Sequence, residues 1–99
     1  MFHANESISV PNKIMGHPVE LAHATDFPED QIKVELFRSL KDGSGFVRGL
    51  DVGVNEVYHL QKFPDFVVAE KDYKRNVGIM QMVVEQETDE SRSQSILFF

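Results

Sequence analysis

Residues 25–43 read TDFPEDQIKVELFRSLKDG, and the conformation of this stretch decides how the whole fold is interpreted. Asp26, followed three residues later by Glu29, has the form of a capping box at a helix N-terminus. Apolar residues then recur at every fourth position, which is the spacing of one helix face. Gly43 can end a helix. We therefore predict a helix over residues 27–41.

The alternative interpretation of the same stretch is a β-hairpin. Ile32, Val34 and Leu36 alternate with polar residues, as they would in a strand with one face in the core. The Asp42-Gly43 pair that follows is a frequent two-residue hairpin turn. The capping signals at both ends favour the helix, and the hairpin remains the alternative.

Segments on either side of this stretch predict strands. Alternating apolar residues indicate short strands at residues 7–10, 19–23, 46–54 and 57–60. Residues 77–85 form a nearly unbroken apolar run, which is typical of a central strand covered on both faces. Residues 66–75 fit either a helix or a strand. We expect an α+β fold, mostly antiparallel β-sheet with one helix, and the alternative is an all-β barrel or sandwich.

The length of 99 residues predicts a single domain over residues 1–99. We expect a polar N-terminal arm at residues 1–18 and an acidic-to-apolar C-terminal tail at residues 85–99. The chain has no cysteine, its N-terminus lacks the pattern of a signal peptide, and its apolar runs are too short to span a membrane. These features predict a protein of the cytoplasm or of an assembled particle, without a membrane association.

Catalytic and metal-binding signals are weak. The sequence contains no G-x-S-x-G, H-E-x-x-H or phosphate-binding glycine loop. His17, His23 and Asp26 lie near one another in sequence, with His3 or His59 as a conceivable third ligand, but their spacing matches no metal-site pattern. We therefore predict no catalytic residue, no metal and no cofactor. A metal-dependent enzyme that uses histidines is the second alternative.

The end of the chain is the candidate binding element. Ile96, Leu97, Phe98 and Phe99 follow a stretch that is almost wholly polar. Four apolar residues in a row would be an aggregation risk unless they dock on another surface. We expect them to bind a protein partner or a sister subunit, which would make the chain a homo-oligomer in the second case. The predicted function is a non-enzymatic, acidic, protein-binding subunit, either an accessory component of a larger assembly such as a virus particle or a regulator that occupies a basic surface.

The first alternative function is binding of single-stranded nucleic acid. Aromatic and basic side chains that could form a stacking platform are Arg48, Tyr58, Lys62, Tyr73, Lys74 and Arg75. The tail resembles the acidic tail of single-stranded-DNA-binding proteins, which ends in an aromatic residue and recruits partners. It departs from that pattern because Arg92 interrupts the acidic residues and Ile96-Leu97 is more apolar. The formal net charge of −6 argues against nucleic acid as a partner.

Overall fold

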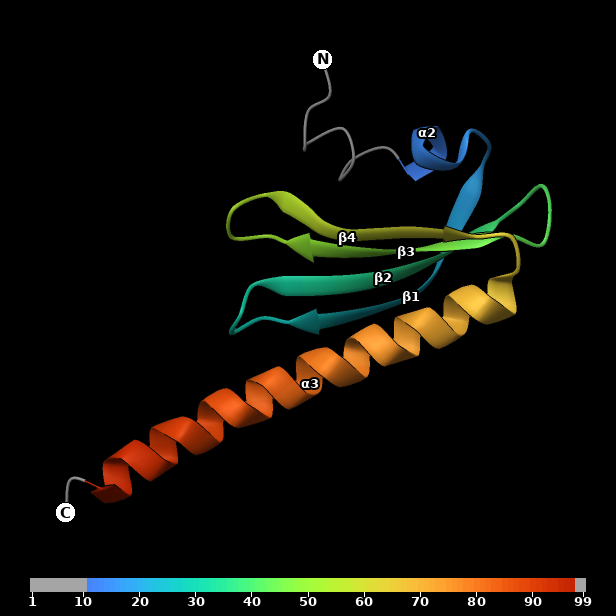
Figure 1. Cartoon of the computed structure of the whole chain (residues 1–99). Coiled ribbons are helices and arrows are strands. Elements are labelled where there is room, and N and C mark those ends of the chain that lie inside the picture. The colour runs from blue at the N-terminus through green and yellow to red at the C-terminus, as the bar shows by residue number, and fades with distance from the viewer. Residues whose placement is uncertain (1–10, 98–99) are drawn as a thin grey trace.

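The computed structural model describes the backbone of residues 11–97 and the side chains of residues 11–86. The described elements in chain order are α2 (Pro11–Met15), β1 (Val19–Phe27), β2 (Ile32–Ser39), β3 (Gly45–Asp51), β4 (Glu56–Phe63) and α3 (Phe66–Leu97) (Figure 1). The strands form one antiparallel sheet in the order β1-β2-β3-β4. The sheet stays open, so the predicted α+β class is confirmed and the barrel alternative is not adopted.

The deciding stretch is a β-hairpin, so the prediction of a helix over residues 27–41 is wrong. Asp26 is not a helix cap but a residue of β1, where it pairs with Lys33 of β2. The turn is closed by backbone hydrogen bonds of 3.2 Å from Asp30 N–H to the Phe27 carbonyl and from Gln31 N–H to the Pro28 carbonyl. Proline and acidic residues suit a tight turn as well as they suit a first helical turn.

The two middle strands, β2 and β3, are covered on both faces. On the side that faces α3, Val34, Leu36 and Val47 have no exposed surface. On the opposite side, the stacked rings of Phe37 and Phe46 lie with their centroids 4.5 Å apart and are also buried. The alternating pattern of β2 is therefore that of a central strand.

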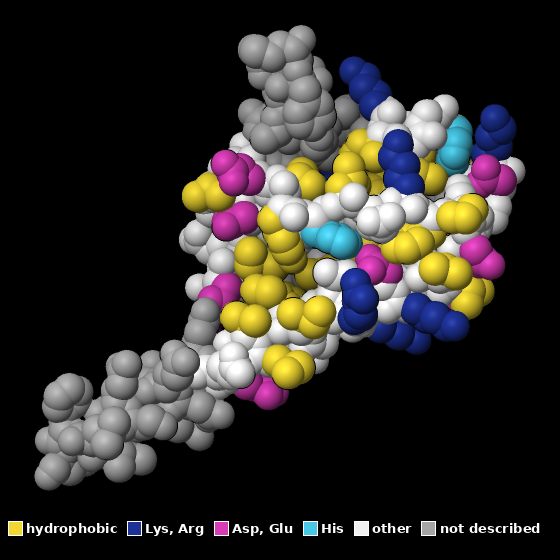
Figure 2. All heavy atoms as spheres, viewed as in Figure 1, with side chains coloured by type: hydrophobic (Ala, Val, Ile, Leu, Met, Phe, Trp, Pro, Cys, Tyr) yellow, Lys and Arg dark blue, Asp and Glu magenta, His cyan; other side chains and the backbone are white. Residues whose placement is uncertain are grey.

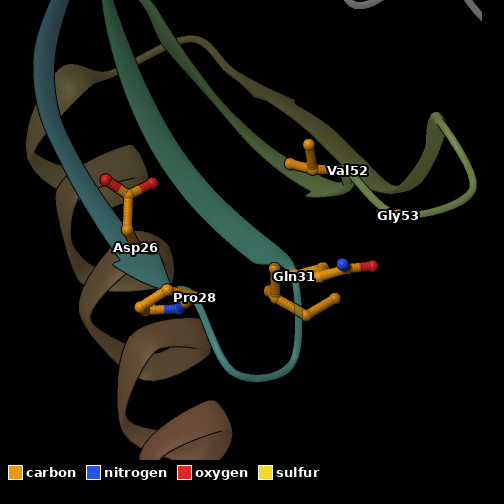
Figure 3. Close-up of a pocket in the computed structure, with 6 residues that line it drawn as sticks. Asp26, Pro28, Gln31, Val52 and Gly53 are labelled. Carbon is orange, nitrogen blue, oxygen red and sulfur yellow. The ribbon is translucent and has the colours of Figure 1, made fainter.

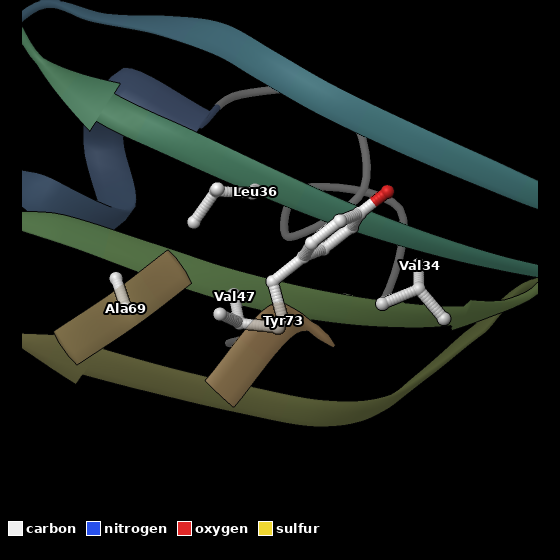
Figure 4. Packing of buried hydrophobic residues seen from close by; sticks show 5 residues of the cluster. All are labelled: Val34, Leu36, Val47, Ala69 and Tyr73. Carbon is white, nitrogen blue, oxygen red and sulfur yellow. The ribbon is translucent and has the colours of Figure 1, made fainter. Parts of the chain in front are cut away.

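Helix α3 packs on the sheet through one stripe of its surface. Ala69 and Tyr73 are buried against Val34, Leu36 and Val47 of the sheet (Figure 4). One turn before and after them, Phe66 and Val77 are half-buried against the same cluster. These spacings of three and four residues keep one side of a helix on the sheet.

Residues 77–85 belong to α3, so the prediction that they form a central strand is wrong. The strands predicted at residues 19–23, 46–54 and 57–60 are confirmed as the cores of β1, β3 and β4, although β3 ends at Asp51. The strand predicted at residues 7–10 lies outside the described residues. Of the predicted N-terminal arm, residues 11–15 form α2, which lies on the side of the sheet away from α3 (Figure 1).

Helix α3 is longer than the sheet that it covers. Its 32 residues span about 48 Å, whereas a strand of eight residues such as β4 spans about 27 Å. The C-terminal part of the helix consequently projects past the sheet (Figure 1). Among the described residues, no helix is both long enough and apolar enough to cross a membrane.

Candidate functional site

The predicted docking residues lie at the far end of α3. The backbone of Ile96 and Leu97 completes the helix, and residues 85–97 continue α3 without a break. The side chains of these two residues, and the whole of Phe98 and Phe99, lie outside the described residues. Their role in binding a partner stays a prediction.

The predicted nucleic-acid platform is not assembled. Arg48 is only 3% exposed and forms an ion pair of 2.9 Å with Glu35 inside the sheet face opposite α3. Tyr73 is buried in the core, where its hydroxyl lies 2.5 Å from the Thr25 hydroxyl. Neither side chain can stack on a base in this fold. The four platform residues that remain exposed are Tyr58, Lys62, Lys74 and Arg75.

The described histidines serve three separate structural contacts. His17 Nδ1 lies 3.2 Å from the Ser39 hydroxyl, the His23 ring stacks on Tyr73, and His59 Nε2 lies 3.1 Å from Asp72 Oδ2. No three metal-ligating side chains come together anywhere in the described part of the chain. His3 lies outside that part.

Two hollows flank the β1–β2 turn. The larger has a volume of about 400 Å³ and is lined by residues in and beside the β1–β2 and β3–β4 turns, namely Asp26, Pro28, Gln31, Ile32, Val52 and Gly53 (Figure 3). The smaller, of about 270 Å³, lies between the same turn and Val84 of α3, and its polar lining includes Glu29 and Asp30. The ionisable side chains of both linings are carboxylates alone, and no histidine or cation lies beside them to complete a recognisable catalytic arrangement.

The rotation of α3 about its own axis is fixed by polar contacts as well as by the core. Asp72 accepts a hydrogen bond of 3.1 Å from the Asn76 side chain and contacts His59 of β4. Arg75 lies one turn further along, with Nη2 3.6 Å from Asp72 Oδ1. Because Tyr73 faces the sheet and Asp72 faces β4, the remaining side of the helix points away from the domain.

We call this side the outer face of α3 and define it by Arg75, Gly78, Ile79, Met82 and Glu85. Their spacing of three and four residues places them together on the helix, opposite the core stripe. Ile79 and Met82 are 52% and 62% exposed, although both are large and apolar. Figure 2 shows hydrophobic side chains on the exposed surface of the helix where it leaves the sheet.

Charge changes sign along the exposed surface of α3. The first described turns of α3 carry Lys71, Lys74 and Arg75, all exposed. Further along, Glu85 begins the acidic stretch of the sequence.

On the face shown in Figure 2, Lys and Arg side chains are absent from the end of the molecule formed by the β1–β2 and β3–β4 turns, which is acidic.

Sequence reasoning missed the outer face because it assigned residues 77–85 to a strand. The spacing of Phe66, Ala69, Tyr73 and Val77 is the signal that could have identified the helix. Once these four residues occupy the core side, Ile79 and Met82 cannot face the sheet as well. Their exposure follows from helix geometry alone.

No protein-family model, curated protein or solved structure matches this chain.

Proposed function

We propose that the chain is a non-enzymatic, protein-binding subunit and that the outer face of α3 is its binding element. The observation that carries this proposal is the exposure of Ile79 and Met82, at 52% and 62%, on a helix whose other side is already anchored in the core. Full burial of such a side chain contributes about 1.5–3 kcal/mol. An amphipathic or two-faced helix that leaves its own domain is a common element for docking on another protein.

The acidic character of the protein fits the same proposal. Its formal net charge is −6, and the end of the sheet next to the β1–β2 turn presents Asp26, Glu29 and Asp30. Such a charge keeps a small protein soluble. An accessory subunit of a larger assembly, in the cytoplasm or in a particle, would stay soluble through its charge and make contact through the apolar outer face.

Site-specific photo-crosslinking tests the proposal. A photoreactive amino acid at Met82 in the full chain should give a discrete cross-linked protein product in the cells that produce the chain. Val54 in the β3–β4 turn is the matched control position, because it is apolar and also 62% exposed. Absence of any product from Met82, or an equally strong product of the same mass from Val54, would contradict the assignment of the outer face as the binding element.

A further inference from the structure

We propose that the partner of the outer face is a second copy of this chain, with the two α3 helices antiparallel about a two-fold axis at the level of residue 80. This inference rests on the proposed function and names the partner. The observation that supports it is that the outer face is complementary to a second copy of itself in the antiparallel orientation.

The register follows from the symmetry. In an antiparallel pair, residues equally far from the axis along the helix face each other. Arg75 and Glu85 lie five residues on either side of residue 80, and Gly78 and Met82 lie two residues on either side. An isologous interface makes each of these contacts twice.

Charge selects this arrangement. The Arg75 side chain is 73% exposed, and its contact with Asp72 is long, at 3.6 Å. Glu85, ten residues further along the helix, is also exposed. Antiparallel pairing brings each Arg75 to the Glu85 of the other copy, whereas parallel pairing would bring two Arg75 side chains together. Opposite charges at the flanks of a helix pair set its orientation in this way.

Shape supports the same register. A glycine in the middle of a helix weakens it relative to alanine, and a Cβ atom at Gly78 would meet no atom of the described residues within 4 Å. The described part of the domain therefore gives no packing reason for the glycine. Met82 is long, flexible and 62% exposed, and it can fill the space above the Gly78 of the other copy.

The apolar centre completes the contact. Ile79 lies next to the axis, so the two Ile79 side chains approach each other and the Met82 side chains. The contact is one helix face wide and smaller than a standard interface of about 1,600 Å². We therefore expect a weak, reversible dimer whose association is sensitive to salt.

Charge reversal in the full chain tests the pairing. Arg75→Glu places a carboxylate against Glu85, and Glu85→Arg places a guanidinium against Arg75, so each single variant should weaken dimerisation roughly tenfold or more by sedimentation equilibrium at low ionic strength. The double variant Arg75→Glu/Glu85→Arg restores both contacts and should regain most of the affinity. Lys74→Glu is the control, because it makes the same charge change on an exposed residue outside the outer face.

Circular dichroism and thermal melting of every variant verify that the fold is kept. The pairing is overturned if the wild-type chain is a monomer at all accessible concentrations. It is also overturned if the double variant is no tighter than the singles, or if Lys74→Glu weakens association as much as Arg75→Glu.

The cross-linking experiment at Met82 separates this inference from the proposed function. A product with twice the chain mass of 11.3 kDa supports both. A product with a different protein keeps the proposed function and overturns the self-pairing. If Met82 gives no cross-linked product, both the proposed function and the self-pairing are contradicted.

Discussion

Replacing Gly45 with alanine should destabilise the fold, because this glycine allows α3 to approach the sheet. Gly45 is the first residue of β3 and is buried. A Cβ atom there would lie 2.8 Å from the Phe37 carbonyl oxygen and 3.1 Å from both the Ala69 Cβ and the Phe66 Cδ1. The carbonyl oxygen belongs to the backbone of β2 and cannot rotate away. Either the sheet or the helix must therefore shift.

Overpacking of this kind costs about 1–3 kcal/mol. For a domain of this size, each kcal/mol lowers the melting temperature by about 4–8 °C. Urea unfolding followed by circular dichroism measures the free energy of unfolding directly. Gly43→Ala is the matched control, because a Cβ atom at Gly43 would meet nothing within 4 Å, and it should change stability by less than about 0.5 kcal/mol. Equal stability of the Gly45→Ala variant and the wild type would refute the close approach of helix and sheet.

Two further predictions concern buried and turn polar groups. Hydrogen bonds from the side chain and the backbone N–H of Ser44 lower the pKa of Asp42 from 3.8 to about 2. The stability that this carboxylate contributes is therefore present above about pH 4 and lost as the pH falls toward 2, and Asp42→Asn should remove that part of the pH dependence in urea titrations. Arg48→Met should cost about 3–5 kcal/mol, because it leaves the buried Glu35 carboxylate without its guanidinium partner. The double variant Glu35→Leu/Arg48→Met should recover most of that loss, and a cost below about 1 kcal/mol for the single variant would show that Glu35 reaches solvent.

The hairpin at residues 25–43 shows what local sequence can and cannot decide. The alternation of Ile32, Val34 and Leu36 was visible, and it is the pattern that the structure follows. The competing signal came from Asp26, Pro28 and Glu29, which suit a turn as well as a helix start. Local propensity could not separate the two, because the decision depends on pairing with β3, which follows later in the chain.

The ion pair inside the sheet could not be predicted for a related reason. Arg48 is thirteen residues from Glu35 in sequence, and only the register of β2 against β3 places them opposite each other. Without that register, the sequence predicts an exposed binding residue at Arg48, whereas the side chain is buried. The same holds for Tyr73, because its burial depends on the side of α3 that meets the sheet.

The error over residues 77–85 has a different physical origin and bears on function. When only one side of a helix is packed, the other side is polar, and the sequence shows a clear hydrophobic period of 3.6 residues. In α3 the outer face carries Ile79 and Met82 between core residues such as Val77, and the added apolar residues hide the period. The pattern that misled the strand prediction is thus the pattern of a helix with two contact faces.

The anchoring of α3 determines what kind of binding element its outer face can be. A flexible tail that docks on a partner must lose the conformational entropy of every residue that becomes ordered. Here Ala69 and Tyr73 hold the helix on the sheet, and the contact between Asp72 and His59 fixes its rotation before any partner arrives. The outer face therefore has a set direction relative to the sheet, and most of the ordering cost is borne by folding of the domain itself. A preorganised helix can bind usefully through a small contact surface. It also means that substitutions on the outer face should change association without changing the stability of the sheet, whereas loss of the core contacts should abolish both.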